Sequence, residues 1–443
     1  MHLAAHFPGV NNTTVWADPR SASQIDFASF RALAETAERG TFDFFFLAEG
    51  LRLREVKGLI HDLDVVGRPE SITVLSALAG VTTHLGLAAT VNATFNEPYE
   101  LARRFASLDH LSGGRAAWNV VTSSDAFTGE NFRRGGYLDH ADRYRRAQEF
   151  VSTSRELWDS WTDGDVIADQ RTGHFSRAGA GSFAHHGPQF DITGAFGIPR
   201  SPQGQPVVIQ AGDSAEGRDF AAAAADVIFT RHGTLEAGQA FYADVKGRLA
   251  AHGRTPDSLK IMPGVTVVVA DTDAEAEEKA AFIRSQQVSG ATAIALSELL
   301  WGIDLTDRDP DGPLPDEDPV VGSGVVRGRV GFTDPVATAA QWRAAAAENG
   351  WSLRETVVAQ QGRQSFIGSP ETVATQLDEF VQADAADGYI LVPHLTPGGL
   401  DDVVDRVVPI LRERGVFRTE YPGTTLRDHL GLDRPSVSAS GAA

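Results

Sequence analysis

The segment LGLAATVNATFNEPYELARRFASLDHLSGGRAAWNVVT, residues 85–122, indicates the fold class of this chain. It contains two apolar runs, Leu85–Val91 and Arg115–Thr122, each short enough for a buried strand. Between them, Pro98 is well placed to start a helix that continues to His110. An apolar strand, a helix and a second apolar strand together predict a parallel sheet covered by helices.

The same alternation of strand and helix runs through most of the chain. The run FDFFFL at Phe42–Leu47 is too apolar for a half-exposed strand, so we expect it to be buried on both faces. Eight units of this kind predict an α/β fold with a closed (β/α)₈ TIM barrel, and an open doubly wound sheet is the alternative. The eight expected strands lie near Leu3, Phe42, Leu85, Arg115, Pro206, Val227, Ile261 and Tyr389.

The chain is longer than a barrel requires. A TIM-barrel core needs about 250 residues, whereas this chain has 443. We therefore expect one barrel domain over residues 1–425 with two large insertions. Residues 162–205 are rich in Gly, His and Ser and lack periodicity, and residues 301–334 are rich in Asp and Pro. The second composition should resist packing and suits a mobile lid.

The end of the chain is expected to lie outside the barrel. Residues 426–443 should form a C-terminal tail, and the chain should be peripheral from Pro422 onward. Pro435–Ala443 is expected to be disordered.

Composition excludes several classes of protein. With no Cys, the chain has no disulfide, thiolate metal site, iron–sulfur cluster or cysteine nucleophile. A formal net charge of −20 disfavours non-specific binding to nucleic acid or to an anionic membrane. No window approaches the roughly 20 apolar residues that span a bilayer, and the first residues, MHLAAHFPGV, do not resemble a signal peptide. We expect a soluble cytoplasmic protein.

In a TIM barrel the active site lies at the carboxyl ends of the strands. His6, Arg231-His232 and His394 follow strands, and imidazole suits proton transfer near neutral pH, although a structural role for each His is equally open. The other candidates at strand ends are Glu49, Thr90, Asn92, Asn119, Asp213 and Ser214.

Two local patterns could hold a phosphate. The segment QAGDS, Gln210–Ser214, ends a strand and opens a helix, where free N–H groups and the helix dipole favour an anion. A plain helix N-cap is the alternative. His140 and Tyr144 lie one helical turn apart at the start of a long helix, and both can donate hydrogen bonds. A surface pair with Tyr144 packed inward is the alternative there.

Other catalytic classes find little support. The first strand has no His-x-His pattern of a metal-dependent hydrolase, so no metal site is expected. The chain also lacks a Gly-x-Ser-x-Gly elbow, a Gly-x-x-x-x-Gly-Lys loop and an early Gly-x-Gly-x-x-Gly motif.

Several stretches, in order and spacing, resemble the bacterial luciferase-like superfamily. The most similar group contains nitrilotriacetate monooxygenase component A and long-chain alkane monooxygenase. The most specific stretch is ASLDHLSGGRAAWNVVTS, and the resemblance spans most of the chain. The matching stretches are Ala37–Gly50, Asn96–Ser123, His140–Tyr144, Gln210–Ser214 and Gly368–Leu377.

The resemblance implies a two-component, FMNH₂-dependent monooxygenase. Such an enzyme takes reduced FMN from a separate NAD(P)H:FMN reductase and uses O₂ to oxygenate a small organic substrate, which the sequence does not identify. Because flavin supplies the redox chemistry, neither a metal nor a protein nucleophile is needed. An F420-dependent oxidoreductase and a non-catalytic flavin-binding protein remain alternatives. A homo-oligomer, either dimer or tetramer, is implied as well.

The resemblance also assigns residues at the phosphate end of the flavin. It implies that Asp213 and Ser214 hold the FMN phosphate, with Tyr144 and His140 nearby.

A second group is implied along the flavin ring. Thr90 and Asn92 would lie beside the flavin, and Asn119 ends the fourth strand next to it. Glu49 stands where many relatives carry Asp, so a carboxylate is retained on a longer side chain.

Overall fold

A computed structural model of the chain describes residues 1–9, 13–53, 55–60, 66–123, 126–132, 140–231, 234–320, 326–327, 334–361 and 365–437. Its centre is a closed barrel of eight parallel strands, which confirms the predicted TIM barrel. All eight expected strands are present. They are β1 (His2–His6), β2 (Phe44–Leu47), β5 (Gly86–Asn92), β6 (Ala116–Val121), β11 (Val207–Gln210), β12 (Val227–Thr230), β13 (Lys260–Val265) and β17 (Gly388–Leu391). Their order around the barrel is β1-β17-β13-β12-β11-β6-β5-β2.

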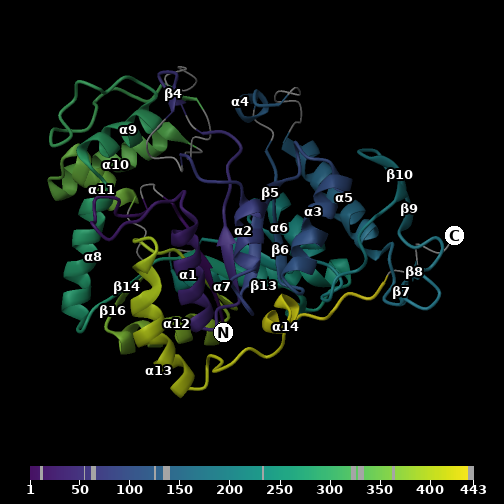
Figure 1. The fold of residues 1–443 in the computed structure, drawn as a ribbon. Coiled ribbons are helices and arrows are strands. Elements are labelled where there is room, and N and C mark those ends of the chain that lie inside the picture. The colour runs from purple at the N-terminus through teal and green to yellow at the C-terminus, as the bar shows by residue number, and fades with distance from the viewer. Residues whose placement is uncertain are drawn as a thin grey trace.

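Helices surround the barrel (Figure 1). In α3 (Pro98–Leu111), Pro98 occupies the first turn as expected, and the helix buries a face that includes Leu101 and Phe105. No helix in the described part of the chain is long and apolar enough to cross a membrane. The other outer helices are α1 (Phe27–Arg39), α2 (Ser71–Ala79), α5 (His140–Asp159), α6 (Ala215–Ala224), α7 (Leu235–Leu249), α8 (Asp273–Gln287), α12 (Pro370–Gln382) and α13 (Val408–Glu413). Short elements are α4 (Ala126–Gly129), η1 (Ala250–His252), η2 (Pro256–Ser258), η3 (Gly398–Leu400) and the π-helical η4 (Val403–Val407).

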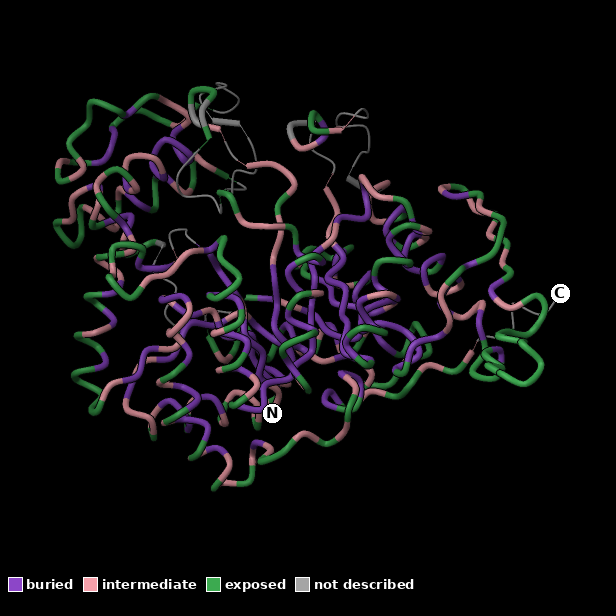
Figure 2. The backbone as a smooth tube through the Cα atoms, in the orientation of Figure 1, coloured by how far each residue is buried: buried purple, intermediate pink, exposed green. Residues whose placement is uncertain are grey.

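The strand pleat divides the core into two layers. Every residue of β2 is buried, as its apolar run predicts. Phe44 and Phe46 belong to the cluster inside the barrel, whereas Phe45 and Leu47 pack outward under the helices. Successive side chains on a strand point to opposite faces. On each strand, the residue two positions after a member of the interior cluster therefore also points inward, at the carboxyl end of the barrel. Figure 2 shows the buried residues concentrated at the centre of the molecule, around the barrel.

One predicted strand is divided in two. The sequence predicts a single strand over Ile261–Ala270, but β13 ends at Val265 and β14 (Val267–Val269) follows it outside the barrel. β14 pairs in parallel with β16 (Phe366–Gly368) in a separate two-stranded sheet. Periodicity cannot show this change of partner, because both strands are equally apolar.

Residues 162–205 contain regular structure that their composition does not predict. They form two antiparallel hairpins, β7 (Val166–Asp169) with β8 (His174–Ser176) and β9 (Ser182–His186) with β10 (Asp191–Ala195).

The hairpin β9–β10 is held on α5 by a partly buried cluster around His185. His185 Nδ1 lies 2.8 Å from Glu156 Oε2, and Nε2 lies 3.3 Å from Glu149 Oε1. Glu149 also accepts a hydrogen bond from the Phe190 N–H at 2.8 Å. Partial burial opposes protonation, but the two hydrogen-bonded carboxylates outweigh it and raise the pKa of His185.

This cluster predicts a pH-dependent contribution to stability. A His whose pKa is raised on folding stabilises the protein below its unfolded pKa, and the effect is lost as pH rises through the folded pKa. The loss of unfolding free energy caused by His185→Gln should therefore be larger at pH 6 than at pH 9. Urea denaturation at both pH values measures this loss of unfolding free energy. The control is His174→Gln, because the His174 side chain is exposed. An equal loss at the two pH values would contradict the assignment.

The second insertion packs more than expected. The helices α9 (Gly290–Trp301), α10 (Pro335–Asn349) and α11 (Leu353–Gln361) form their own apolar cluster, which includes Leu314. Leu305 is also buried. The expectation that residues 301–334 resist packing is therefore wrong for the described residues 302–320. The strands β3 (Glu55–Val56), β4 (Leu59–Ile60) and β15 (Val326–Arg327) form a three-stranded sheet, which joins this insertion to the segment after β2.

The C-terminal segment closes the amino end of the barrel, so the expectation that the chain is peripheral after Pro422 is wrong. The helix α14 (Leu426–Leu430) inserts two leucines into the interior cluster beneath Phe44. Arg427 forms a buried ion pair with Asp226 at 3.1 Å, just before β12. Residues 438–443, part of the segment expected to be disordered, lie outside the described residues.

Truncating Leu426 tests this closure. Leu426 is fully buried and packs against Gly86 at the start of β5. Leu426→Ala should lower the free energy of unfolding by about 2–5 kcal/mol, because a buried cavity forms. The control is Leu111→Ala, whose side chain is 69% exposed and should change stability by less than about 0.5 kcal/mol. Equal losses in urea denaturation would contradict this packing role.

Candidate functional site

The candidate site begins where β1 and β2 end inside the barrel. His6 pairs in register with Phe46, and their rings stack with centroids 5.5 Å apart. His6 Nδ1 is buried and has no hydrogen-bond partner among the described residues. Burial, followed by the charges of Arg68 and Arg231, lowers the pKa of His6 to about 3. The imidazole is therefore neutral at physiological pH.

Strand register also brings Asn119 and Thr90 together, because they lie on the neighbouring strands β6 and β5. They are paired in the register of β5 and β6, and Asn119 Nδ2 donates to Thr90 Oγ1 at 2.9 Å. The Asn119 side chain is on the inner face, and the residue is only 3% exposed. Its Oδ1 has no hydrogen-bond partner in the described chain. A buried acceptor without a partner is costly, so Asn119 Oδ1 is a candidate to accept a hydrogen bond from a ligand.

Asn92 stabilises its own loop. Its Oδ1 accepts hydrogen bonds from the N–H groups of Thr94 at 2.6 Å and Phe95 at 3.2 Å. Its Nδ2 donates to Ser123 Oγ at 2.9 Å. Asn92 thus fixes the turn that follows β5, and these contacts satisfy most of its amide group.

Glu49 is directed toward the start of α2. Its Oε2 accepts hydrogen bonds from the Ser71 N–H at 2.9 Å and from the Ser71 hydroxyl. The same hydroxyl lies 3.4 Å from the carbonyl oxygen of Thr90. Glu49 therefore lies at the same end of the barrel as Thr90, and it is held there through Ser71.

The segment after β11 forms a tight cradle. Ser214 caps α6, because its Oγ accepts the Gly217 N–H at 3.1 Å, and Tyr144 Oη lies 3.5 Å from the same Oγ. A Cβ on Gly212 would lie 2.4 Å from Gln210 Nε2 and 3.3 Å from Tyr144 Oη. A side chain here would displace the Gln210 amide, whose Oε1 accepts the Gly212 N–H at 2.8 Å, so the turn favours glycine. The observed N-cap agrees with the plain structural interpretation, and the exposed Ser214 keeps the site open to an anion.

Asp213 lies beside this cradle and is fixed by β12. Its Oδ1 accepts a hydrogen bond from Thr230 Oγ1 at 2.9 Å. Arg218 donates to the backbone oxygen of Asp213 at 3.0 Å and pairs with Asp244 at 2.9 Å. The two phosphate candidates predicted from sequence, Asp213 and Ser214, thus lie next to each other at one strand end.

The other three candidate His residues are not placed in this group by the described structure. His140 begins α5, and its side chain lies outside the described structure, as does all of His232. His394 lies three residues beyond β17. Burial, followed by the charges of Lys279 and Arg20, lowers its pKa to about 4. Lys279 belongs to α8 and Arg20 to the segment before α1, so neither is on a barrel strand.

The structure adds residues that sequence patterns did not single out. Arg68 donates to the carbonyl oxygens of Phe7, at 3.1 Å, and of Ala48, which ties together the ends of β1 and β2. Phe229 stacks on Phe46 across the barrel, with centroids 5.7 Å apart. The inward position of Phe229 follows from the period of two along β12, whereas nothing in the local sequence marks Arg68.

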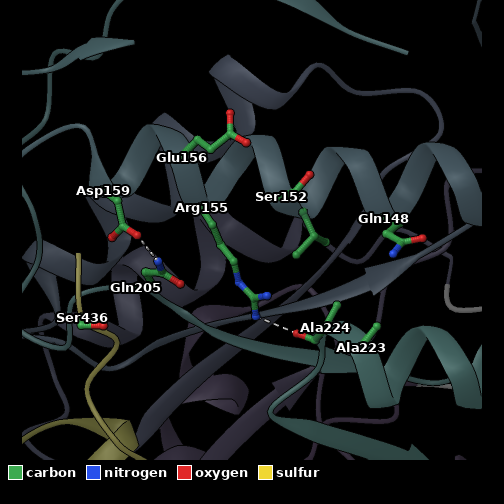
Figure 3. A pocket seen from close by; sticks show the side chains of 10 residues that line it. Gln148, Ser152, Arg155, Glu156, Asp159, Gln205, Ala223, Ala224 and Ser436 are labelled. Atoms are coloured by element: carbon green, nitrogen blue, oxygen red, sulfur yellow. Dashed lines mark hydrogen bonds between the residues drawn. The ribbon is translucent and has the colours of Figure 1, made fainter. Parts of the chain in front are cut away.

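A pocket of about 440 Å³ lies elsewhere, between α5, the end of α6 and the C-terminal segment (Figure 3). Arg155 points across it and donates to the carbonyl oxygen of Ala224 at 2.7 Å, and Gln205 donates to Asp159 at 2.8 Å. Because Gln205 and Ala224 precede β11 and β12, this pocket faces the amino end of the barrel. It is not the candidate site. No group of three His, Asp or Glu side chains suited to a metal occurs among the residues that the structure describes.

Comparison with known proteins gives consistent similarities. A family model described as luciferase-like monooxygenase matches residues 9–409. The chain is 41% identical to nitrilotriacetate monooxygenase component A of Aminobacter aminovorans over 96% of this chain and 93% of that protein. It is 42% identical to N-acetyl-S-(2-succino)cysteine monooxygenase of Bacillus subtilis (strain 168), over 94% of this chain and 92% of that protein. The crystal structure of riboflavin lyase with modified FMN and riboflavin has a TM-score of 0.80 and 29% identity, covering 98% of this chain and 96% of that one.

Proposed function

This chain belongs to the luciferase-like monooxygenase family, and on that premise we propose that it oxygenates a small organic substrate with O₂ and FMNH₂. The family resemblance predicted from sequence is confirmed, and so is a flavin-dependent monooxygenase activity of the two-component kind. We assign the supply of reduced FMN to a separate NAD(P)H:FMN reductase, since a named relative is a component A. A homo-oligomer is part of the same proposal.

The residues at the carboxyl end of the barrel fit FMN. Ser214, with Tyr144 Oη 3.5 Å away, and the narrow turn at Gly212 would hold the phosphate. Asp213 would position this turn through Thr230. His140 belongs to the same proposal through its position at the start of α5.

The other half of the site would hold the flavin ring. Asn119 Oδ1, buried and without a partner, would accept a hydrogen bond from it. Thr90 orients Asn119 through the 2.9 Å hydrogen bond, and Glu49 and Asn92 support the ends of the neighbouring strands. Bound reduced flavin supplies the reaction with O₂. The neutral imidazole of His6 can donate or accept one hydrogen bond at Nδ1 beside the reacting groups, and the aromatic rings of Phe46 and Phe229 exclude water there.

The observation that carries this proposal is the orphaned Oδ1 of Asn119, which lies at the same end of the barrel as the Gly212–Ser214 cradle. One polar acceptor and one anion cradle at the carboxyl end of a barrel match a ligand with an N–H-bearing ring and a phosphate. The unpaired His6 Nδ1 is a further buried polar atom at this end of the barrel.

Oxygen uptake in a coupled assay tests the proposal. The purified protein is mixed with a flavin reductase, NADH, FMN and a substrate panel that includes nitrilotriacetate and N-acetyl-S-(2-succino)cysteine, the compounds named for two relatives. We expect a product that contains one atom from ¹⁸O₂ and forms only when the reductase is present. Turnover with reduced F420 and no O₂ would instead support the F420-dependent alternative, and FMN binding without any product would support a non-catalytic flavin-binding protein.

A further inference from the structure

Arg68 is held at the carboxyl end of the barrel by two backbone groups. It follows the short strand β4 in the chain and lies just before α2. Its Nη1 donates to the carbonyl oxygen of Phe7 at 3.1 Å, and its Nη2 donates to that of Ala48. These carbonyls follow β1 and β2 directly, so the guanidinium is fixed beside His6.

This guanidinium is partly buried and has no carboxylate partner in the described residues. Glu49 is the one described carboxylate whose charge favours the protonated form of Arg68, and its Oε2 is bound to Ser71. Burial lowers the pKa of Arg68 to about 10, which reflects this uncompensated desolvation. Buried charges are normally paired with an opposite charge. Of the five N–H donors of an Arg side chain, two are used here in the described structure.

The surroundings favour an anion at this position. The charges of both Arg68 and Arg231 lower the pKa of His6, so positive potential converges on one place in a chain whose net charge is −20. His6 is neutral and leaves Nδ1 unpaired, so it adds a polar contact without adding charge.

We propose that Arg68 is the anchor for a carboxylate group of the substrate and determines specificity for organic acids. The planar guanidinium fork matches a carboxylate, and two backbone hydrogen bonds preorganise it. The inference rests on the proposed function, because it assigns a substrate class to the same strand-end site. Arg68 is a binding residue in this assignment, and it takes no part in proton or electron transfer.

Binding of two matched small probes tests the proposal on the full-length protein. Succinate is titrated calorimetrically against succinamide, its neutral counterpart, and FMN is titrated separately. We expect succinate to bind at least about 10-fold more tightly than succinamide. Arg68→Gln should weaken succinate binding by about 30-fold, because the buried partner charge is lost, and Arg68→Lys should give an intermediate loss.

Arg155→Gln is the matched control. Arg155 is also partly buried and also donates to a backbone carbonyl, but it lies in the pocket at the amino end of the barrel. The Arg155→Gln substitution should leave succinate binding unchanged. Equal binding of succinate and succinamide, no binding of either, or an equal loss in Arg155→Gln would overturn the proposal.

Two further results keep the test decisive. If the Arg68 variants do not fold, the wild-type protein is instead labelled at its Arg side chains with phenylglyoxal. Succinate should protect Arg68 from labelling and leave Arg155 reactive. A failure to protect Arg68 would overturn the proposal. Selective succinate binding in a protein that binds no FMN would refute the proposed function alone. FMN binding without selective succinate binding would refute this inference alone.

Discussion

His6→Ala should reduce the rate of substrate oxygenation by about 10²–10³-fold, because a positioned hydrogen-bonding side chain at the reacting groups is lost. Flavin binding should change little, since the phosphate cradle is formed by β11 and α6, away from β1. His6 Nδ1 is buried and unpaired, and the pKa of His6 is about 3. The free enzyme should therefore show no ionisation of His6 between pH 6 and 8. The ratio of oxygenated product to FMNH₂ consumed measures the effect, with H₂O₂ as the uncoupled product.

His394→Ala is the matched comparison for His6→Ala. Burial also lowers the pKa of His394, but its charged neighbours Lys279 and Arg20 belong to α8 and to the segment before α1, not to barrel strands. We expect less than about a threefold change in oxygenation, as for a position with no contact to the reacting groups. If His394→Ala impairs the reaction more than His6→Ala, the assignment of His6 is wrong.

Gly212→Val should weaken FMN binding by about 100-fold. A Cβ at this position would lie 2.4 Å from Gln210 Nε2 and 3.1 Å from Gly217 Cα. The Gln210 amide would have to move, which breaks its 2.8 Å hydrogen bond to the Gly212 N–H and disturbs the turn. The hydrogen bonds from this turn to the charged phosphate, each worth about 1.5–3 kcal/mol, should then be weakened. Fluorescence quenching during FMN titration measures the affinity.

Gly247→Val is the control for that substitution. Gly247 lies in α7, and a Cβ there would meet no atom within 4 Å. Its FMN affinity should match that of the wild type. Unchanged FMN binding in Gly212→Val, with the fold intact by circular dichroism, would contradict a phosphate site at this turn.

Local patterns were sufficient to predict the barrel and much of its carboxyl end. Apolar runs such as FDFFFL are buried on both faces only in a covered parallel sheet, so they marked the strands correctly. The ends of those strands then located His6, which pairs with Phe46, and also Thr90 and Asn119, which the register of β5 and β6 brings together. The period of two would also have identified Phe229 as an inward residue.

Features that depend on distant contacts could not be predicted. Arg68 reaches carbonyl groups 61 and 20 residues away, and no pattern around it signals this. The sequence around Leu426 resembles a polar tail, and only the structure shows that Leu426 packs against Gly86. The environment of His394 depends on Lys279 and Arg20, which are distant in sequence, so its position after a strand does not predict that environment.

The most direct test of the central claim is an anaerobic titration of the wild-type protein with FMNH₂. If the carboxyl end of the barrel is a reduced-flavin site, the protein should bind one FMNH₂ per chain, and Ser214→Ala combined with Tyr144→Phe should weaken that binding by about 10-fold or more. Failure of the wild-type protein to bind FMNH₂, or unchanged affinity in the double variant, would contradict the account.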